Sequence, residues 1–273
     1  MERYTTARVL FDAPYGSVSL CHDANQTKCV VKCVSLAQRG QSAQRHRAAE
    51  DIVREIEVTD FLNANGGHPN IVQMQHHFTQ DGCSHLVLEY CNQGDLLTVQ
   101  QLEPSGRFDL PRGLAFFRDI VLGLQFMHKH NLAHRDLSLE NIFVKDGRCK
   151  IGDFGLTVDA TAARTDSVGK LMYMAPEVVD GSARYDPKAA DIWSLGVVLF
   201  VMLTGVPLFE VASTKDKLFR AVARQGLQPV LLICRKKGFL SPEVADLLEK
   251  MLAINPDDRL FVEDILEHDA MQV

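Results

Sequence analysis

The sequence predicts an α+β chain in which a β-rich part precedes a larger, mainly helical part. Its first ninety residues contain short β-like runs at 18–21, 29–36, 71–74 and 85–89, and turn-forming residues interrupt them. Helical patterns follow at 111–130 and over the apolar run 192–206. Apart from one helical pattern at 47–62, the strand-like runs precede the helical ones, an order that is typical of an α+β architecture.

Length and composition indicate an ordinary globular protein. A chain of 273 residues can bury a large core, as one large domain or as two packed lobes. Its hydrophobic content of 46% and charged content of 23% argue against disorder. The net charge of -6 argues against a nucleic-acid surface, so we expect no nucleic-acid partner.

The cysteines and the apolar segments predict a cytoplasmic chain. Seven cysteines form no C-x-x-C pair and leave an odd count, which fits reduced thiols better than a disulfide framework. The first residues contain no apolar segment of a secretory signal. The run 192–206 is interrupted by Ser194 and Gly196 and is shorter than the roughly 20 residues that a bilayer requires. We therefore expect a buried helix there and no membrane partner.

One stretch, residues 134–155 (HRDLSLENIFVKDGRCKIGDFG), concentrates the chemistry. It places Asp136, Asn141 and Asp153 on polar turns around an apolar, β-prone piece. Three oxygen-bearing side chains at the ends of one small hairpin suit a divalent ion such as Mg²⁺, which prefers oxygen ligands. The pattern indicates Asp136 as a base for a hydroxyl group, with Asn141 and Asp153 as the metal ligands.

These motifs resemble a known family. H-R-D-x-x-x-x-N followed by D-F-G resembles the signature pair of the eukaryotic protein kinases, and Ala175-Pro176-Glu177 matches the A-P-E that comes next. The resemblance covers about residues 8–270 and implies a single catalytic domain over 1–273. Its small lobe, 1–90, would hold a five-stranded antiparallel sheet plus one helix, and its larger lobe, 91–273, would be mainly helical.

The glycine-rich lid of that family is divergent here. The matching stretch, 11–18, keeps only Gly16 and Val18 of the pattern G-x-G-x-x-G-x-V, which closes over the ATP phosphates. Phe11 and Ala13 replace the other glycines, and Pro14 adds rigidity without an N–H donor. An ordinary β-turn is the alternative for this stretch taken alone.

Lys32 ends an apolar run that resembles V-A-I-K, whose lysine pairs the α- and β-phosphates of ATP. The helix predicted at 47–62 offers Glu55 or Glu57 as its ion-pair partner. We favour Glu55, because apolar residues beside it would turn that face toward the lobe interior, but Glu57 stays open.

The resemblance also implies an ATP pocket formed by Gly16, Val18, Val30, Lys32, Leu88, Glu89, Cys91, Asp95 and Phe143. Val30 stands where the family most often has an alanine against the adenine, and it narrows that space. Leu88 would guard the rear of the pocket, and the connector 86–91 would bind adenine through its backbone. Asp95 would meet the ribose.

Two residues near the predicted base depart from the serine/threonine pattern. Ser138 stands where those enzymes have a lysine that neutralises the γ-phosphate, and Lys170 follows Gly169 where a threonine usually bonds the base. We hypothesise an exchange in which Lys170 supplies the charge and the Ser138 hydroxyl supplies the hydrogen bond. The alternative is a Lys170 that faces solvent, in a slow or inactive site.

The resemblance implies a regulatory site around Arg135, which in many relatives holds a phosphate on the activation segment, the stretch from D-F-G to A-P-E (153–177). The family spacing, counted back from Ala175, leads to Asp166, whose fixed carboxylate would replace that phosphate. Thr165 and Ser167 flank it and are candidate phosphosites. Asp191 and the pair Glu177 and Arg259 have structural roles in this interpretation, Asp191 as a cap on the backbone of the catalytic loop.

The expected function is ATP- and Mg²⁺-dependent phosphorylation of serine or threonine hydroxyls on a protein substrate. Tyrosine specificity is disfavoured, because the segment before A-P-E lacks the proline-led pattern of those enzymes. A pseudokinase, which would bind nucleotide or act as a scaffold without turnover, is the alternative. We expect a monomer and leave room for a regulatory partner.

Overall fold

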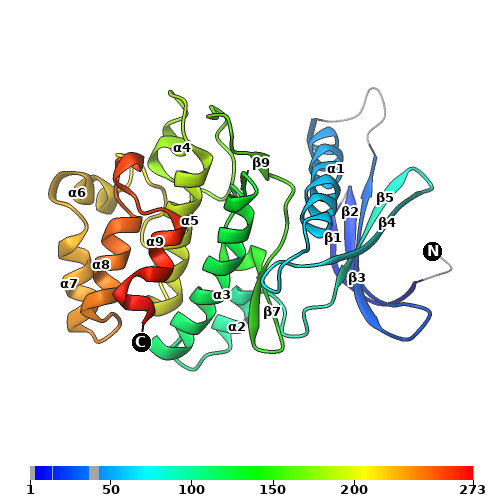
Figure 1. Cartoon of the computed structure of the whole chain (residues 1–273), viewed down its shortest axis with the longest axis horizontal. Helices are drawn as coiled ribbons and strands as arrows, with labels where there is room; N and C mark the ends of the chain where they lie inside the picture. Colours follow the sequence, from blue (N-terminus) through cyan, green and yellow to red (C-terminus); the bar gives the residue numbers. More distant parts are fainter. Residues whose placement is uncertain (1–3, 14, 37–42, 273) are drawn as a thin grey trace.

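The computed structural model describes residues 4–13, 15–36 and 43–272. Pro14, expected to stiffen the lid, lies outside these residues. The described chain forms two lobes, with a sheet and one long helix on one side and the remaining helices on the other (Figure 1). The predicted α+β, two-lobed architecture is confirmed.

The small lobe is built on a five-stranded sheet with antiparallel pairing and the strand order β1-β2-β3-β5-β4. Its strands are β1 Thr5–Ala13, β2 Gly16–His22, β3 Lys28–Ser35, β4 Met74–Gln80 and β5 Cys83–Glu89. Strand β1 lacks an alternating pattern because it is an edge strand exposed along most of its length. The strand predicted at 71–74 was placed too early, since Ile71 bridges to Ile151 in the large lobe instead.

Helix α1 (Ala43–Ala64) packs on the inner face of this sheet. Its Ile52 lies in one apolar cluster with Val34 of β3 and Leu86 of β5. The helix begins four residues before the predicted start and takes in part of the polar stretch that precedes it. Glu55 follows Ile52 by one helical turn and therefore also points toward β3.

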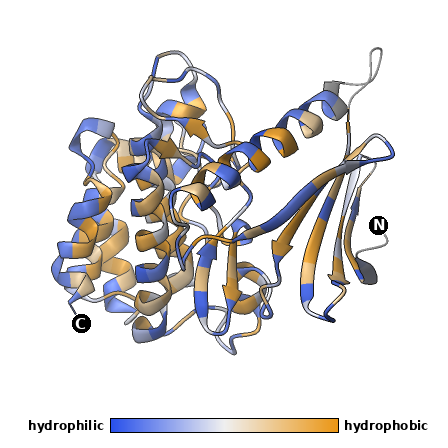
Figure 2. Ribbon diagram, turned by 45° about the vertical axis from the view of Figure 1, so that its right-hand side comes forward, coloured by the Kyte–Doolittle hydropathy of each residue, from blue (hydrophilic) through white to orange (hydrophobic). Residues whose placement is uncertain are grey.

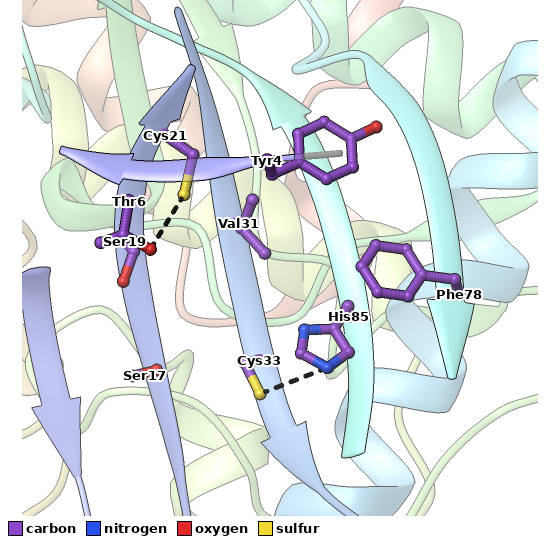
Figure 3. Close-up of a pocket in the computed structure, with 9 residues that line it drawn as sticks. All are labelled: Tyr4, Thr6, Ser17, Ser19, Cys21, Val31, Cys33, Phe78 and His85. Atoms are coloured by element: carbon purple, nitrogen blue, oxygen red, sulfur yellow. Dashed lines mark hydrogen bonds between the residues drawn. The ribbon is translucent and has the colours of Figure 1, made fainter. Parts of the chain in front are cut away.

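The outer face of the sheet holds a small hollow (Figure 3). Phe78 stacks between Tyr4 and His85 there, and the Cys33 Sγ lies 3.9 Å from the His85 Nε2. The hollow has a volume of about 60 Å³, whereas pockets for nucleotide-sized ligands hold several hundred. It also lies on the face opposite α1, so it is not the site predicted by the motifs.

The large lobe is centred on helices α3 and α5. Its helices are α2 Leu96–Gln101, α3 Leu110–Lys129, α4 Pro176–Asp180, α5 Pro187–Thr204, α6 Lys217–Gln225, α7 Gln228–Lys236, α8 Pro242–Met251 and α9 Val262–Glu267, with short 3₁₀ turns η1 Leu139–Asn141, η2 Pro256–Asp258 and η3 Asp269–Met271. Apolar residues gather on the sides where these helices face one another (Figure 2). The length and composition of α5 would suit a membrane span, but 89% of it is buried. It is the buried helix that the sequence predicted.

Four short strands lie within or beside the stretch 134–155. They are β6 Leu132–Ala133, β7 Ile142–Lys145, β8 Arg148–Ile151 and β9 Val158–Asp159. Strands β7 and β8 form the predicted hairpin, and the Gly152 N–H donates to the Asn141 carbonyl at 2.9 Å where its two ends meet. Asn141 and Asp153 are therefore brought to the same end of the hairpin.

Candidate active site

One buried carboxylate holds the backbone of the catalytic loop, residues 134–141. The side chain of Asp191, from α5, accepts hydrogen bonds from the N–H groups of His134 and Arg135, both at 2.8 Å. It also accepts one from the His128 Nε2 at 3.0 Å. Arg135 has φ +69, a left-handed conformation that non-glycine residues adopt only when their surroundings impose it. The predicted capping role of Asp191 is confirmed.

The imidazole of His134 joins the two halves of the chemical stretch, a link that sequence reasoning missed. The His134 Nδ1 accepts from the Asp136 N–H at 3.2 Å, and its Nε2 donates to the Gly152 carbonyl at 3.1 Å. The same ring packs edge-on against the buried Phe154. The first letter of the H-R-D motif was the available signal for this residue.

Asp136 lies in a polar corner and is oriented by its neighbours. Its Oδ2 accepts from the Asn141 Nδ2 at 2.7 Å, and its Oδ1 accepts from the Lys170 N–H at 3.0 Å. The Asn141 Nδ2 also donates to the Asp136 carbonyl at 2.8 Å. These contacts fix the carboxylate in one orientation, as a group that receives a proton from a bound hydroxyl requires.

Lys32 connects both parts of the site. Its Nζ donates to the Glu55 Oε2 at 2.6 Å and to the Asp153 Oδ1 at 3.3 Å. The Glu55 side chain is 2% exposed, whereas Glu57 is exposed on the opposite side of α1. The structure therefore places Glu55, not Glu57, against Lys32. One ammonium thus ties β3, α1 and the start of the activation segment together.

The Lys32 ammonium and the Asp153 carboxylate stabilise each other's charged forms, whereas burial and the neighbouring Asp153 charge raise the pKa of Glu55. Burial lowers the pKa of Lys32, but the carboxylates of Glu55 and Asp153 outweigh it and hold the pKa above its usual value. Burial raises the pKa of Asp153, but the Lys32 ammonium outweighs it and the pKa is lowered. Both groups therefore stay ionised at neutral pH.

The oxygen ligands present fit a magnesium ion. The Asn141 amide oxygen, which accepts from the Lys170 Nζ at 3.2 Å, and the Asp153 carboxylate, which is 45% exposed, are the two candidate oxygen ligands. In the part of the chain that the structure describes, no group of three or more His, Cys, Asp or Glu side chains could hold a metal ion. Mg²⁺ suits such a sparse set, because it commonly takes one or two protein carboxylates and completes its shell with water and phosphate oxygens.

Lys170, Ser138 and Asp136 meet although they lie far apart in the sequence. The Lys170 Nζ is 2.8 Å from the Ser138 Oγ and 3.4 Å from the Asp136 Oδ2. One detail of the sequence hypothesis was wrong. The Ser138 hydroxyl bonds Lys170 rather than the base, because the ammonium lies between them. The hydrogen bond to Asp136 comes from the Lys170 backbone.

Arg135 and Asp166 form an ion pair across the activation segment. The Arg135 guanidinium also donates to the Asp166 carbonyl at 3.3 Å and to the Tyr185 hydroxyl at 3.1 Å. Tyr185 in turn donates to the Asp166 carbonyl at 2.8 Å. Thr165 and Ser167 are exposed on either side. No spacing in the sequence pointed to Tyr185.

The residues assigned to the ATP pocket divide into two groups. The strand register places Val18, Val30 and Leu88 on the sheet face that carries Lys32. Gly16 has a backbone role, since a Cβ there would lie 2.5 Å from the Cys33 carbonyl of β3.

The remaining pocket residues lie at the connection between the lobes. Phe143, on β7, forms an isolated β-bridge with Asp95. Cys91, which lies before Asp95 on the connector, is buried. Both oxygens of the Asp95 carboxylate cap α2 through Thr98. The Glu89 side chain pairs with Lys145 and Lys150. The Glu89 backbone N–H donates to the Gln73 carbonyl at 2.9 Å, so both its carboxylate and its N–H already have partners within the chain.

Arg259, which follows the site in the sequence, makes two further contacts in the large lobe. Arg259 forms ion pairs with Glu177 at 2.7 and 2.8 Å, as predicted, and its guanidinium lies over the Trp193 ring.

A family model described as the protein kinase domain matches residues 4–271. The chain belongs to the protein kinase family. The similarity to this family therefore extends over nearly the whole chain, beyond the motifs that first indicated it.

Several curated protein kinases are similar to it. Aurora kinase A-A of Xenopus laevis is 29% identical over 272 residues, which cover 98% of this chain and 62% of that protein. Aurora kinase B of Xenopus tropicalis is 31% identical, with 98% and 70% covered. Calcium-dependent protein kinase 7 of Oryza sativa subsp. japonica is 32% identical, with 98% and 48% covered. The chain spans about three fifths of the length of the Aurora A relatives.

Proposed function

We propose that this chain is an ATP-dependent protein kinase that phosphorylates serine or threonine hydroxyls of protein substrates. The proposal rests on the assembled contacts of Lys32 with Glu55 and Asp153, beside an oriented Asp136. One similar protein, from Arabidopsis thaliana, is named serine/threonine-protein kinase PEPKR2 and is 29% identical over 97% of this chain.

In the proposed reaction the substrate hydroxyl oxygen attacks the γ-phosphorus of ATP. The bond between that phosphorus and the bridging oxygen breaks, and ADP leaves with the electron pair. The hydroxyl proton goes to the Asp136 carboxylate. Lys32, fixed by Glu55, binds the α- and β-phosphates. Positioning and charge neutralisation, rather than covalent chemistry by the protein, lower the barrier.

Mg²⁺ would be held by Asn141 and Asp153, and when bound it neutralises charge on the phosphate oxygens. The contribution of the chain is to keep Asp153 ionised beside Lys32 and to hold Asn141 against Asp136.

The activation segment is proposed to work without a phosphate. The Asp166 carboxylate supplies the negative charge that Arg135 needs, and Tyr185 fixes the same turn. Thr165 and Ser167 are then dispensable as phosphosites, although both are exposed.

The setting of the enzyme is also a proposal. The seven cysteines, all within the described residues, are free thiols, which supports a reducing cytoplasmic compartment. The net charge of -6 supports a protein substrate rather than nucleic acid. We propose a monomer that acts away from membranes.

The test is phosphate transfer by the purified chain from labelled ATP to Ser/Thr and Tyr peptide libraries, with and without Mg²⁺. We expect Mg²⁺-dependent labelling of Ser/Thr peptides, a loss of about 10²-fold or more in Asp136→Asn, and no change in Asp146→Asn, an exposed aspartate in the β7–β8 turn. Wild-type labelling no greater than that of Asp136→Asn contradicts the proposal. ATP binding followed by thermal shift would then indicate a nucleotide-binding module.

A further inference from the structure

Lys170 holds its ammonium among three oxygens of the catalytic loop. The Nζ lies 2.8 Å from the Ser138 Oγ, 3.2 Å from the Asn141 Oδ1 and 3.4 Å from the Asp136 Oδ2. They belong to a buried hydroxyl, a proposed metal ligand and the proposed base, in that order. We propose that Lys170, from the activation segment, is the catalytic cation that binds the transferring phosphoryl group. This inference rests on the proposed kinase function.

The loop itself offers no such charge. Residues 136–141 read DLSLEN and contain no lysine or arginine. Ser138 is completely buried and neutral, so it can orient a cation but cannot replace one. The Lys32 ammonium is bound to Glu55 and Asp153 instead. Charge that develops near Asp136 therefore meets the Lys170 ammonium.

The backbone of Lys170 is fixed, so its position is not that of a loose surface lysine. Its N–H donates to the Asp136 Oδ1 at 3.0 Å, and its carbonyl accepts from the Tyr173 N–H at 2.8 Å. Gly169 before it has φ +104, and a Cβ there would lie 2.7 Å from the Arg135 carbonyl. Only glycine permits this approach, which lays the segment directly against the catalytic loop.

The side chain nevertheless keeps an open side. Lys170 is 38% exposed, whereas Asp136 is 16% exposed. An ammonium has three rotatable donors on a flexible stem, so it can exchange one protein oxygen for a phosphate oxygen without losing all its partners. Its contact with Ser138, the shortest of the three, anchors it meanwhile. Ser138 is thus a positioning residue.

In the transfer step, Lys170 contacts oxygens of the γ-phosphoryl group while the substrate oxygen bonds to phosphorus and ADP departs. The proton passes to Asp136, and Lys170 keeps its own protons throughout. A cation aimed at the developing charge lowers the barrier of the chemical step more than the free energy of ATP binding. Removing it should therefore reduce kcat and leave the dissociation constant of ATP nearly unchanged.

The experiment compares Lys170→Thr, Ser138→Lys and the double variant Ser138→Lys/Lys170→Thr with wild type. The readouts are kcat on a Ser/Thr peptide, the dissociation constant of Mg²⁺–ATP and the melting temperature. Lys188→Thr is the matched control, because this lysine binds the Asn131 Oδ1 outside the site. We expect kcat to fall about 10²-fold in Lys170→Thr, with ATP affinity within about threefold.

The double variant gives the sharpest outcome. Moving the cation back onto the loop should recover kcat at least tenfold over Lys170→Thr, whereas Ser138→Lys alone places two ammonium groups together and loses activity. If Lys170→Thr stays within threefold of wild type, the inference is wrong. It is equally wrong if kcat, ATP affinity and melting temperature fall together and the double variant recovers nothing, which is the behaviour of a structural tie. A wild type without phosphate transfer overturns the proposed function itself.

Discussion

The ion pair between Arg135 and Asp166 leads to a prediction about activation. The Arg135 guanidinium is only 5% exposed, and Asp166 supplies its carboxylate partner. Asp166→Asn keeps the shape of the side chain and removes its charge. The guanidinium then has neutral partners only, the Asp166 carbonyl and the Tyr185 hydroxyl. We expect the activation segment to lose order and the catalytic rate to fall.

The size of the effect follows from burial. Hydrogen bonds to charged groups contribute about 1.5–3 kcal/mol, but the Asp166 side chain is 54% exposed, and exposed pairs contribute less. A cost of about 1–1.5 kcal/mol, at 1.4 kcal/mol per factor of ten, lowers kcat/KM roughly 5- to 10-fold.

The protonation state of Asp166 does not complicate the assay. Burial raises its pKa, but the hydrogen bond and charge of Arg135 outweigh this, so the pKa lies below its ordinary value. A depressed carboxyl pKa means that the pair is intact above the ordinary pKa of about 3.9 and is lost as the pH falls through the lower folded value. Between pH 6 and 8 the effect should be constant.

The assay is peptide phosphorylation by protein treated with a general phosphatase, with intact mass confirming the absence of phosphate. Wild type should keep its activity within about twofold, and Asp166→Asn should show the 5- to 10-fold loss. Asp159→Asn, on the same segment and without an Arg135 contact, is the matched control. Thr165→Ala and Ser167→Ala should both resemble wild type. The reasoning is refuted if phosphatase abolishes wild-type activity while Asp166→Asn has no effect.

Three further predictions concern the supports of the site. Glu55→Gln should lower kcat/KM for ATP by about 10²-fold in the peptide assay, because Lys32 loses its charged partner. Glu57→Gln, the control, should stay within twofold of wild type. Equal effects of the two variants would contradict the assignment of Glu55 as the partner of Lys32. Asp191→Ala leaves the backbone N–H groups of His134 and Arg135 without an acceptor. It should reduce the free energy of unfolding by about 3 kcal/mol in urea titrations. A loss under 1 kcal/mol would be evidence against the capping role of Asp191. Glu89→Gln should cost about 2 kcal/mol at pH 7. Burial raises the Glu89 pKa, but hydrogen bonds from two lysines outweigh it and lower the pKa. The stability difference between Glu89→Gln and wild type should therefore vanish as the pH falls through the lowered Glu89 pKa. Thermal melts from pH 7 to pH 3 that show a constant stability difference would rule out this pair.

The large-lobe motifs could be read from the sequence because their residues are close together along the chain. The spacing of Asp136, Asn141 and Asp153 around a short hairpin is set by local strand and turn geometry, and the structure reproduces that hairpin. Both long apolar patterns predicted a helix. Helix α3 lies within one residue of the predicted 111–130, whereas α5 begins five residues before the predicted run 192–206. Strands β1 and β4 were not predicted at their observed positions, because edge strands that face solvent carry little pattern.

The sequence by itself determined the family, the two-lobed fold and the set of chemical groups. It favoured Glu55 correctly but left Glu57 open, because that choice depends on how α1 is rotated against the sheet. Nor could it show that Ser138 bonds the Lys170 ammonium rather than Asp136, or that Tyr185 supports Asp166. These contacts join residues that are many positions apart, and only the packing of the activation segment against the catalytic loop brings them within hydrogen-bonding distance.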